Sequence, residues 1–172
     1  EKQYQVAVYI LEFGHLGTPD FQINLARLHQ QPGIPVKFIQ DAAHLPEAIP
    51  GQIVLDALLG SGINRFLEGL TAAVAQHINQ SPGPVIAIDI PSGLFSDQST
   101  KGQLTVKANH TLTFQCLKPA MVMAENAAAI GELHILDIGL HPAYEAETTS
   151  AFEMMDEAMA KAIYKPRPAY VH

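Results

Sequence analysis

The sequence contains no tryptophan, one cysteine and no long hydrophobic run. Because an internal disulfide needs two cysteines, the composition favours a reduced, cytoplasmic protein in which the thiol of Cys116 is buried and inert. No stretch approaches the roughly 18 consecutive apolar residues that a membrane helix needs. The first four residues also lack the pattern of a secretory signal peptide. We therefore expect no membrane partner.

Positive charge is scarce as well, with 10 lysines and arginines against 17 aspartates and glutamates. A formal net charge of −7 argues against a broad phosphate-binding surface, so nucleic acid is not an expected partner. The 8 histidines form no H-x-H or H-x-x-x-H pair and have no cysteine pair beside them, and we predict no zinc site. The dinucleotide fingerprint G-x-G-x-x-G is also absent.

What is present is an alternation of short apolar strands and amphipathic helices in a chain of 172 residues. The patterns predict strands over 5–11, 36–39, 53–59, 111–114 and 132–136, and another beginning at Val85. Helices are predicted after Thr18-Pro19 and along the apolar face from Leu67 to Ile78. This alternation favours an α/β fold, a three-layer Rossmann-like open sheet, mostly parallel, with helices on both faces.

The character of the chain changes near Tyr144, so we predict one domain over residues 1–143 and a C-terminal helix and linker over 144–172. Phe152, Met155, Met159 and Ile163 are spaced as one apolar helix face. The stretch 165–168, Lys-Pro-Arg-Pro, is typical of an extended linker between domains.

Two apolar runs each carry one carboxylate and open into a loop of small residues. Asp56 lies in the run 53–62 and Asp89 in the run 85–93. Continuous apolar runs are typical of strands buried on both faces of a parallel sheet, where an unpaired carboxylate is strongly disfavoured. Each aspartate therefore needs a partner or a function. Ligands of open α/β sheets bind outside the carboxyl ends of the strands, where both loops are expected.

Each of these residues also has a simpler interpretation. The two aspartates can accept hydrogen bonds from the following turn and do nothing more. Gly60-Ser61-Gly62 can bind an anionic group at the start of the predicted helix, with Arg65 adding charge, or can be a plain turn. Ser92 lacks the G-x-S-x-G surroundings of a nucleophile and suits an oxygen ligand better. Lys118 places an ammonium at the same end of the sheet or is a solvated loop residue.

With these residues assembled, the chain resembles the NAD(P)H-hydrate epimerase family, the N-terminal epimerase domain of bifunctional nicotinamide-nucleotide repair enzymes. The resemblance rests on the stretches 56–65, 87–93, 113–119 and 137–139. It implies a Rossmann-like fold, a potassium ion held partly by Asp56 and Ser92, and hydrated NADH or NADPH as substrate. It also implies that the substrate is contacted by Asp89 and by the loop Gly60, Ser61, Gly62, Ile63, Asn64, Arg65 and Phe66. We hypothesise that Asp89 is the general acid and base.

The resemblance also raises expectations about the rest of the protein. The family's first strand and glycine-rich Asn-Asn-Gly-Gly-Asp loop are missing, so we expect an N-terminally truncated domain with an exposed apolar sheet edge and possible association as a homodimer. The polar tail resembles the linker to an ADP- or ATP-dependent NAD(P)H-hydrate dehydratase, the expected fused or separate partner. Two alternatives stay open: a catalytically silent nucleotide-binding or protein-interaction module of the same fold, and an ordinary Rossmann oxidoreductase, which the missing fingerprint disfavours.

Overall fold

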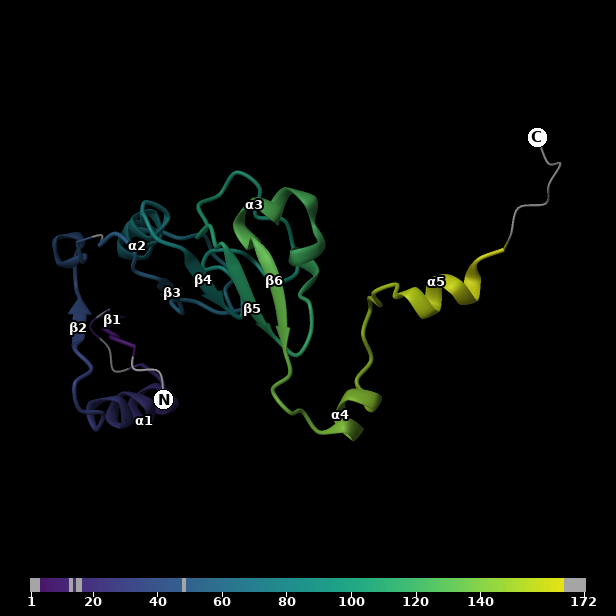
Figure 1. Ribbon diagram of the computed structural model, residues 1–172, viewed down its shortest axis with the longest axis horizontal. Helices are drawn as coiled ribbons and strands as arrows, with labels where there is room; N and C mark the ends of the chain where they lie inside the picture. The colour runs from purple at the N-terminus through teal and green to yellow at the C-terminus, as the bar shows by residue number, and fades with distance from the viewer. Residues whose placement is uncertain (1–3, 13, 15–16, 48, 166–172) are drawn as a thin grey trace. The chain divides into compact units, whose positions relative to one another are not determined.

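The computed structural model describes residues 4–12, 14, 17–47 and 49–165 (Figure 1). The chain divides into two compact units, Glu1–Ile138 and Gly139–His172. The first unit holds every described strand. None of the helices in the described part is long and apolar enough to cross a membrane. The predicted domain boundary at 143/144 lies close to this division but stays a prediction.

The first unit alternates strands and helices along the chain. Its strands are β1 (Val8–Leu11), β2 (Val36–Ile39), β3 (Val54–Asp56), β4 (Val85–Ile88), β5 (His110–Phe114) and β6 (Glu132–Leu136). Its α-helices are α1 (Pro19–His29), α2 (Gly69–Asn79) and α3 (Ala127–Ile130), and short 3-10 turns cover 42–44, 119–122 and 124–126. Every strand pair among the described residues is parallel, in a two-stranded sheet β1-β2 and a four-stranded sheet β3-β4-β5-β6. The α/β, Rossmann-like fold class is confirmed.

Helix α1 begins where the sequence predicts. The side chain of Thr18 accepts a hydrogen bond from the amide of Phe21 at 3.2 Å, which satisfies one of the amides that a helix start leaves unpaired. Pro19 occupies the first turn, where its missing N–H has little consequence. The predicted strands over 5–11 and 53–59 are present but shorter, as β1 and β3.

One face of the four-stranded sheet packs against helices α2 and α3. Residues of α2 form a buried apolar cluster with Val85 of β4, and Val54 of β3, its register partner, packs against that cluster. On β5, the hydroxyl of Thr111 donates to the carbonyl of Ile130 in α3 at 2.7 Å. Thr111 lies on the same face as Val85, because it is in register with Ala87, two residues beyond Val85. The main core of this unit therefore lies between that face and the two helices.

Strand β3 departs from the prediction of a strand buried on both faces. Leu55 is 62% exposed and Ile53, just before the strand, is 58% exposed. In the part of the chain that the structure describes, β3 pairs only with β4 and so lies at the edge of its sheet. Leu55 also points to the face opposite α2, because side chains alternate along a strand. The apolar edge that we expected is therefore present at β3.

The second unit contains two short helices, α4 (Pro142–Glu147) and α5 (Glu157–Ile163). Asp156 caps α5 by accepting a hydrogen bond from the amide of Met159 at 2.7 Å. The prediction of a single apolar face from Phe152 to Ile163 was wrong, because Phe152 and Met155 precede this capped helix start. Within the predicted linker 165–168, only Lys165 belongs to the described residues.

Candidate functional site

Three neighbouring strands of the four-stranded sheet have their carboxyl ends at the same end of the sheet. Asp56 is the last residue of β3, Asp89 directly follows β4, and Phe114 ends β5. Because the strands are parallel, the loops that follow them also lie at this end of the sheet. The structure therefore brings both predicted aspartates and both small-residue loops to the same end of the sheet.

Asp56 and Ser92 form one buried hydrogen-bonded pair. The hydroxyl of Ser92 donates to Oδ1 of Asp56 at 2.6 Å, and its backbone amide donates to Oδ2 at 2.8 Å. Oδ1 also accepts the amide of Leu58 at 3.3 Å. The same hydroxyl accepts the amide of Leu59 at 2.9 Å. These contacts connect the loop after β3 to the loop after β4.

Asp56 is only 1% exposed, and no basic side chain is among the causes that shift its pKa. Burial raises the pKa of Asp56 above its ordinary value, although the hydrogen bonds from Ser92 and Leu58 act in the opposite direction. The groups gathered here are oxygens of a carboxylate, of the Ser92 hydroxyl and of the Leu59 carbonyl, which lies 3.3 Å from that hydroxyl. Such a donor set suits a hard cation, which would offset the desolvated charge.

Asp89 occupies the turn directly after β4. Its φ of 67° is in the left-handed region, which aspartate tolerates better than most residues. Its amide donates to the carbonyl of Leu112 in β5 at 2.8 Å, so the turn is tied to the neighbouring strand. Oδ1 accepts the amide of Phe114 at 3.4 Å. The backbone thereby directs the carboxylate toward the end of β5.

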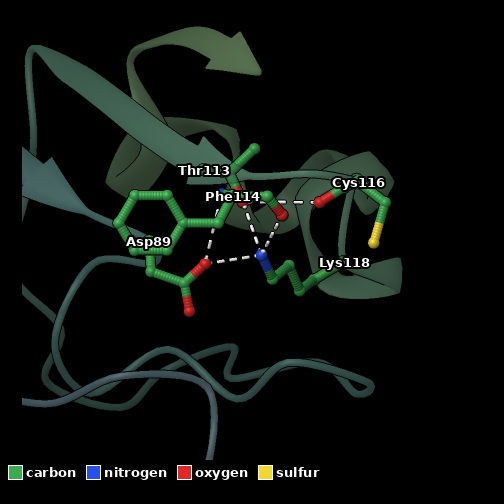
Figure 2. Close-up of polar contacts among 5 residues, drawn as sticks. All are labelled: Asp89, Thr113, Phe114, Cys116 and Lys118. Carbon is green, nitrogen blue, oxygen red and sulfur yellow. Dashed lines mark hydrogen bonds and ion pairs between the residues drawn. The ribbon is translucent and has the colours of Figure 1, made fainter. Parts of the chain in front are cut away.

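Lys118 provides the charge partner of Asp89 (Figure 2). Its ammonium donates to Oδ1 of Asp89 at 2.5 Å, to the hydroxyl of Thr113 at 2.8 Å and to the carbonyl of Phe114 at 3.1 Å. The Asp89 and Lys118 side chains are 17% and 15% exposed, so water screens the pair only partly. The three contacts use all three donors of the ammonium. They hold it in one position beside the carboxylate.

The lysine determines the ionisation of Asp89. Burial by itself raises the pKa of Asp89, but the hydrogen bond and charge of Lys118, with hydrogen bonds from Phe114 and Ser61, hold that pKa below its ordinary value. Asp89 is therefore ionised at neutral pH. Lys118 was left open by the sequence between a site residue and a solvated one, and the structure places it in the site.

The loop between β3 and α2 lies beside Asp89. A Cβ atom added to Gly60 would lie 4.0 Å from Oδ2 of Asp89, and the Ser61 side chain hydrogen-bonds the same carboxylate. Further along the loop, Asn64, Arg65 and Phe66 are exposed, whereas Ile63 and Leu67 are half-buried. The Phe66 ring lies 5.3 Å from that of Phe95 between centroids. The predicted loop therefore reaches the aspartate through its first residues.

The structure favours one of the two interpretations that the sequence left open for this loop. Gly60-Ser61-Gly62 was either an anion site at the start of a helix or a plain turn. Helix α2 begins only at Gly69, and its cap residue is the acidic Glu68. The start of α2 therefore offers no favourable position for an anion next to Gly62.

Gly93 is required by the close approach of two segments in the loop after β4. Its φ is 94°, and an added Cβ would lie 2.7 Å from both the carbonyl oxygen of Leu104 and a side-chain carbon of Leu67. Ser92, just before it, is held from the other side, because the amide of Val106 donates to the Ser92 carbonyl at 2.8 Å. Only glycine fits this position without displacing backbone.

The sequence missed Thr113 and misjudged Cys116. The Thr113 side chain receives a hydrogen bond from the Lys118 ammonium, yet nothing marks it among the other residues of β5. Cys116 was expected to be buried, but it is exposed in the turn between β5 and Lys118. Gln115, with a φ of 60°, turns the chain there and carries Cys116 away from the sheet.

The fold and the site define a class of protein, a Rossmann-like α/β domain with a polar site at the carboxyl ends of its parallel strands. Such sheets bind their ligands at this end. Residues 1–120 match the model of the family described as YjeF-related protein N-terminus. The chain therefore belongs to this family.

Curated relatives agree with that assignment. The chain is similar to the bifunctional NAD(P)H-hydrate repair enzyme of Leishmania braziliensis, 38% identical over 120 residues, which cover 70% of this chain and 20% of that protein. It is 34% identical over 115 residues to the NAD(P)H-hydrate epimerase of Rhodopirellula baltica, covering 67% of this chain and 47% of the relative. A bifunctional repair enzyme of Vibrio cholerae is 28% identical over 98% of this chain and 35% of its own length. The chain thus spans less than half of each of these relatives.

Proposed function

We propose that the protein is an NAD(P)H-hydrate epimerase, which interconverts the R and S epimers of hydrated NADH and NADPH. The observation that carries this proposal is the Asp89–Lys118 pair beside the loop that begins at Gly60. The names of the relatives support the substrate class. The loop 60–66 is the proposed substrate-contacting segment, and Asp89 contacts the reacting part of the nucleotide.

The reaction needs a proton to be delivered and then recovered. In the hydrate, a hydroxyl is attached to a carbon bonded to the ring nitrogen. Protonation of that hydroxyl lets the nitrogen lone pair expel water, and addition of water to the opposite face inverts the centre and releases one proton. Protons therefore balance over the cycle, and a paired acid and base next to that carbon is sufficient.

The sequence-based hypothesis gave both tasks to Asp89, whereas the lowered pKa of Asp89 and the position of Lys118 favour a division between the two residues. Because Asp89 is ionised at neutral pH, it suits the base that receives the proton of the incoming water. We assign delivery of the proton to the leaving hydroxyl to the Lys118 ammonium, whose carbonyl and hydroxyl partners hold it in place. Transfer of that proton from Asp89 to Lys118 then restores the starting protonation of both residues.

Potassium is proposed as the resident ion near Asp56 and Ser92. The buried carboxylate with its raised pKa, the Ser92 hydroxyl and the Leu59 carbonyl form a donor set that fits it. When bound, the ion supplies positive charge that offsets the carboxylate and orders the two loops. Thermal unfolding in potassium and in sodium buffers tests this: potassium should stabilise the protein but not Asp56→Asn. Equal stabilisation of that variant by potassium would contradict the assignment, and Asp97→Asn, which changes an exposed aspartate, is the control.

The activity test follows a mixture of the two hydrate epimers in potassium buffer. An excess of a dehydratase that consumes only one epimer leaves the other behind unless it is epimerised. We expect the residual epimer to disappear when the protein is added. If it persists while calorimetry shows that the hydrate binds, the silent nucleotide-binding module is the correct interpretation.

Two proposals concern partners. The bifunctional names of several relatives support the proposal that a dehydratase, fused or separate, acts on the product of this domain. Association as a homodimer through the exposed edge of β3 remains a prediction. Sedimentation of the protein would test it.

A further inference from the structure

A second cluster of polar side chains lies at the opposite end of the sheet. His110 begins β5 and Glu132 begins β6, and the two residues are in register. His134 follows Glu132 by two positions on β6. Because side chains alternate between the faces of a sheet, all three lie on the same face. The three are 39–68% exposed, so solvent reaches them.

The potential ligand atoms of these three side chains converge. Nδ1 of His110 lies 3.1 Å from Nε2 of His134. The Glu132 oxygens lie 3.5 Å from that His110 nitrogen and 3.7 Å from that His134 nitrogen. Both carboxylate separations exceed the ordinary range of a hydrogen bond. One ligand atom from each of the three residues nevertheless lies within 4.8 Å of the other two.

We propose that His110, Glu132 and His134 bind a divalent transition-metal ion of the zinc class. Ligands at about 2.0–2.1 Å from a tetrahedral zinc lie about 3.3 Å from one another. The two nitrogens are 3.1 Å apart, close to that value, and each has a different oxygen of Glu132 near it, Oε2 at 3.5 Å from His110 and Oε1 at 3.7 Å from His134. Two imidazoles and a carboxylate suit zinc, copper and nickel better than magnesium or calcium, which take oxygen ligands. The exposed side leaves the fourth position to water.

Hydrogen bonds and close packing order the backbone at the start of β5 and β6 without a metal. The amide of Glu132 donates to the carbonyl of Asn109 at 2.8 Å, and the amide of Ala108 donates to that of Ala129 at 2.9 Å. Gly131, just before Glu132, packs so closely that an added Cβ would lie 2.3 Å from the Asn109 carbonyl oxygen. Little backbone ordering is therefore needed when the ion binds.

This site is distinct from the site at the carboxyl ends of the strands. At the ordinary rise of about 3.3 Å per residue, His110 and Phe114 at the two ends of β5 are about 13 Å apart. Its ligands include nitrogen, whereas those near Asp56 are oxygens. A bound ion would link β6 to β5, its one partner strand in the described residues, and would stabilise that edge of the sheet. The inference does not depend on the epimerase proposal.

The absence of a zinc site was predicted from linear spacing alone. His110 and His134 are too far apart in the sequence to form a histidine motif, and they meet because β5 and β6 pair side by side. Sheet register therefore supplies what the spacing lacks.

The test measures zinc binding by competition with a chromophoric chelator, on protein from which any purification tag has been removed. We expect one zinc per chain, a rise in the unfolding temperature with zinc, and no response to magnesium or calcium. His110→Gln and His134→Gln should each weaken zinc binding by at least about tenfold, since changes around metal ligands commonly have effects of that size. His29→Gln, which changes an exposed histidine of α1, should bind like the parent.

Two results would overturn the proposal. The first is zinc affinity that is unchanged in His134→Gln, which would place the ion elsewhere. The second requires no variant and so holds even if the substitutions impair folding. Cobalt bound to the unmodified protein should show the intense visible bands of a four- or five-coordinate site. Only the weak spectrum of hydrated cobalt would rule out the cluster.

Discussion

Asp56 ends β3 and Asp89 directly follows the neighbouring parallel strand β4, in similar sequence surroundings, but their carboxylates have different partners. Asp56 is buried and accepts hydrogen bonds from the serine hydroxyl and from backbone amides, and its pKa is raised. Asp89 is half-buried and paired with the Lys118 ammonium, and its pKa is lowered. Burial acts in the same direction on both. The comparison shows that a cationic neighbour, together with the hydrogen bonds around it, reverses for Asp89 the rise in pKa that burial causes in both carboxyl groups.

The largest expected effect comes from replacing Asp89, the carboxylate whose pKa is lowered. Asp89→Asn should lower the epimerisation rate by about 10²–10⁴, the usual contribution of general acid–base catalysis. Asparagine also tolerates the left-handed backbone at this position, so the fold should be kept. Coupled epimer-consumption rates and far-UV circular dichroism measure the two outcomes. A parental rate in this variant would remove Asp89 from the chemistry, and Asp97→Asn serves as the matched control.

Removing the Lys118 ammonium should shift the pKa of Asp89 upward, in the same direction as that of Asp56. In Lys118→Gln, burial is opposed by fewer hydrogen bonds and no charge, so the pKa of Asp89 should rise and the acidic limb of the pH–rate profile should move to higher pH. We expect a rate loss of about 10²-fold, because a proton donor is also lost. Steady-state rates over a range of pH measure both effects.

Lys118→Arg separates these two effects. An arginine keeps the positive charge but does not release its proton, so the acidic limb should stay near its parental position while the rate remains low. Full activity in Lys118→Arg would show that Lys118 acts only through its charge. Lys107→Gln, which changes an exposed lysine, is the control.

A smaller effect is expected on the buried side. In Asp56→Asn, the new amide offers one acceptor oxygen where two carboxylate oxygens now serve Ser92. One buried donor of Ser92 then loses its acceptor, which should lower the free energy of unfolding by about 1–3 kcal/mol. Urea unfolding measures the change. An unchanged midpoint in sodium buffer would contradict the importance of this hydrogen-bonded pair.

The smallest expected effect is on the pH dependence of stability, where the two aspartates should act with opposite sign. The folded state binds the Asp56 proton more tightly than the unfolded chain does, so ionisation of Asp56 lowers stability as the pH rises from the ordinary value of 3.8 through the raised pKa. Asp89 contributes stability above its unfolded pKa, and this contribution is lost as the pH falls through the lowered folded pKa.

Unfolding free energies of Asp56→Asn and Asp89→Asn, measured in sodium buffer from pH 3 to 7, should therefore diverge from the parent in opposite directions. The loss of stability with rising pH that Asp56 causes in the parent should be absent from Asp56→Asn. In Asp89→Asn the parental loss of stability toward acid should become smaller. Parallel curves for the two variants would contradict the contrast between the carboxylates.

Much of the site could be predicted because short-range patterns carry it. The apolar runs ending at Asp56 and Asp89, and the small residues after them, placed both carboxylates at the ends of parallel strands. The helix start at Thr18-Pro19 was also correct, because capping depends on neighbouring residues. Helix α2 was predicted from Leu67, two residues before its observed start at Gly69, because the spacing of apolar residues marks a helix better than it marks the helix end.

Contacts between segments far apart in the chain could not be predicted from the sequence. Lys118 reaches Asp89 only because β5 pairs with β4 in one particular register, which also brings Thr113 to the same ammonium. Leu55 is exposed because β3 is an edge strand, and edge or centre is a property of the whole sheet.

The amino-acid sequence by itself determined the α/β class, the family resemblance and the positions of the two aspartates along the chain, because periodicity, turn residues and motifs are local. Only the tertiary structure decided which aspartate has a cation beside it and which histidines meet. Those outcomes depend on the pairing of strands that are far apart in the chain, and the ionisation of a carboxyl group depends on the charges within a few ångströms of it in space.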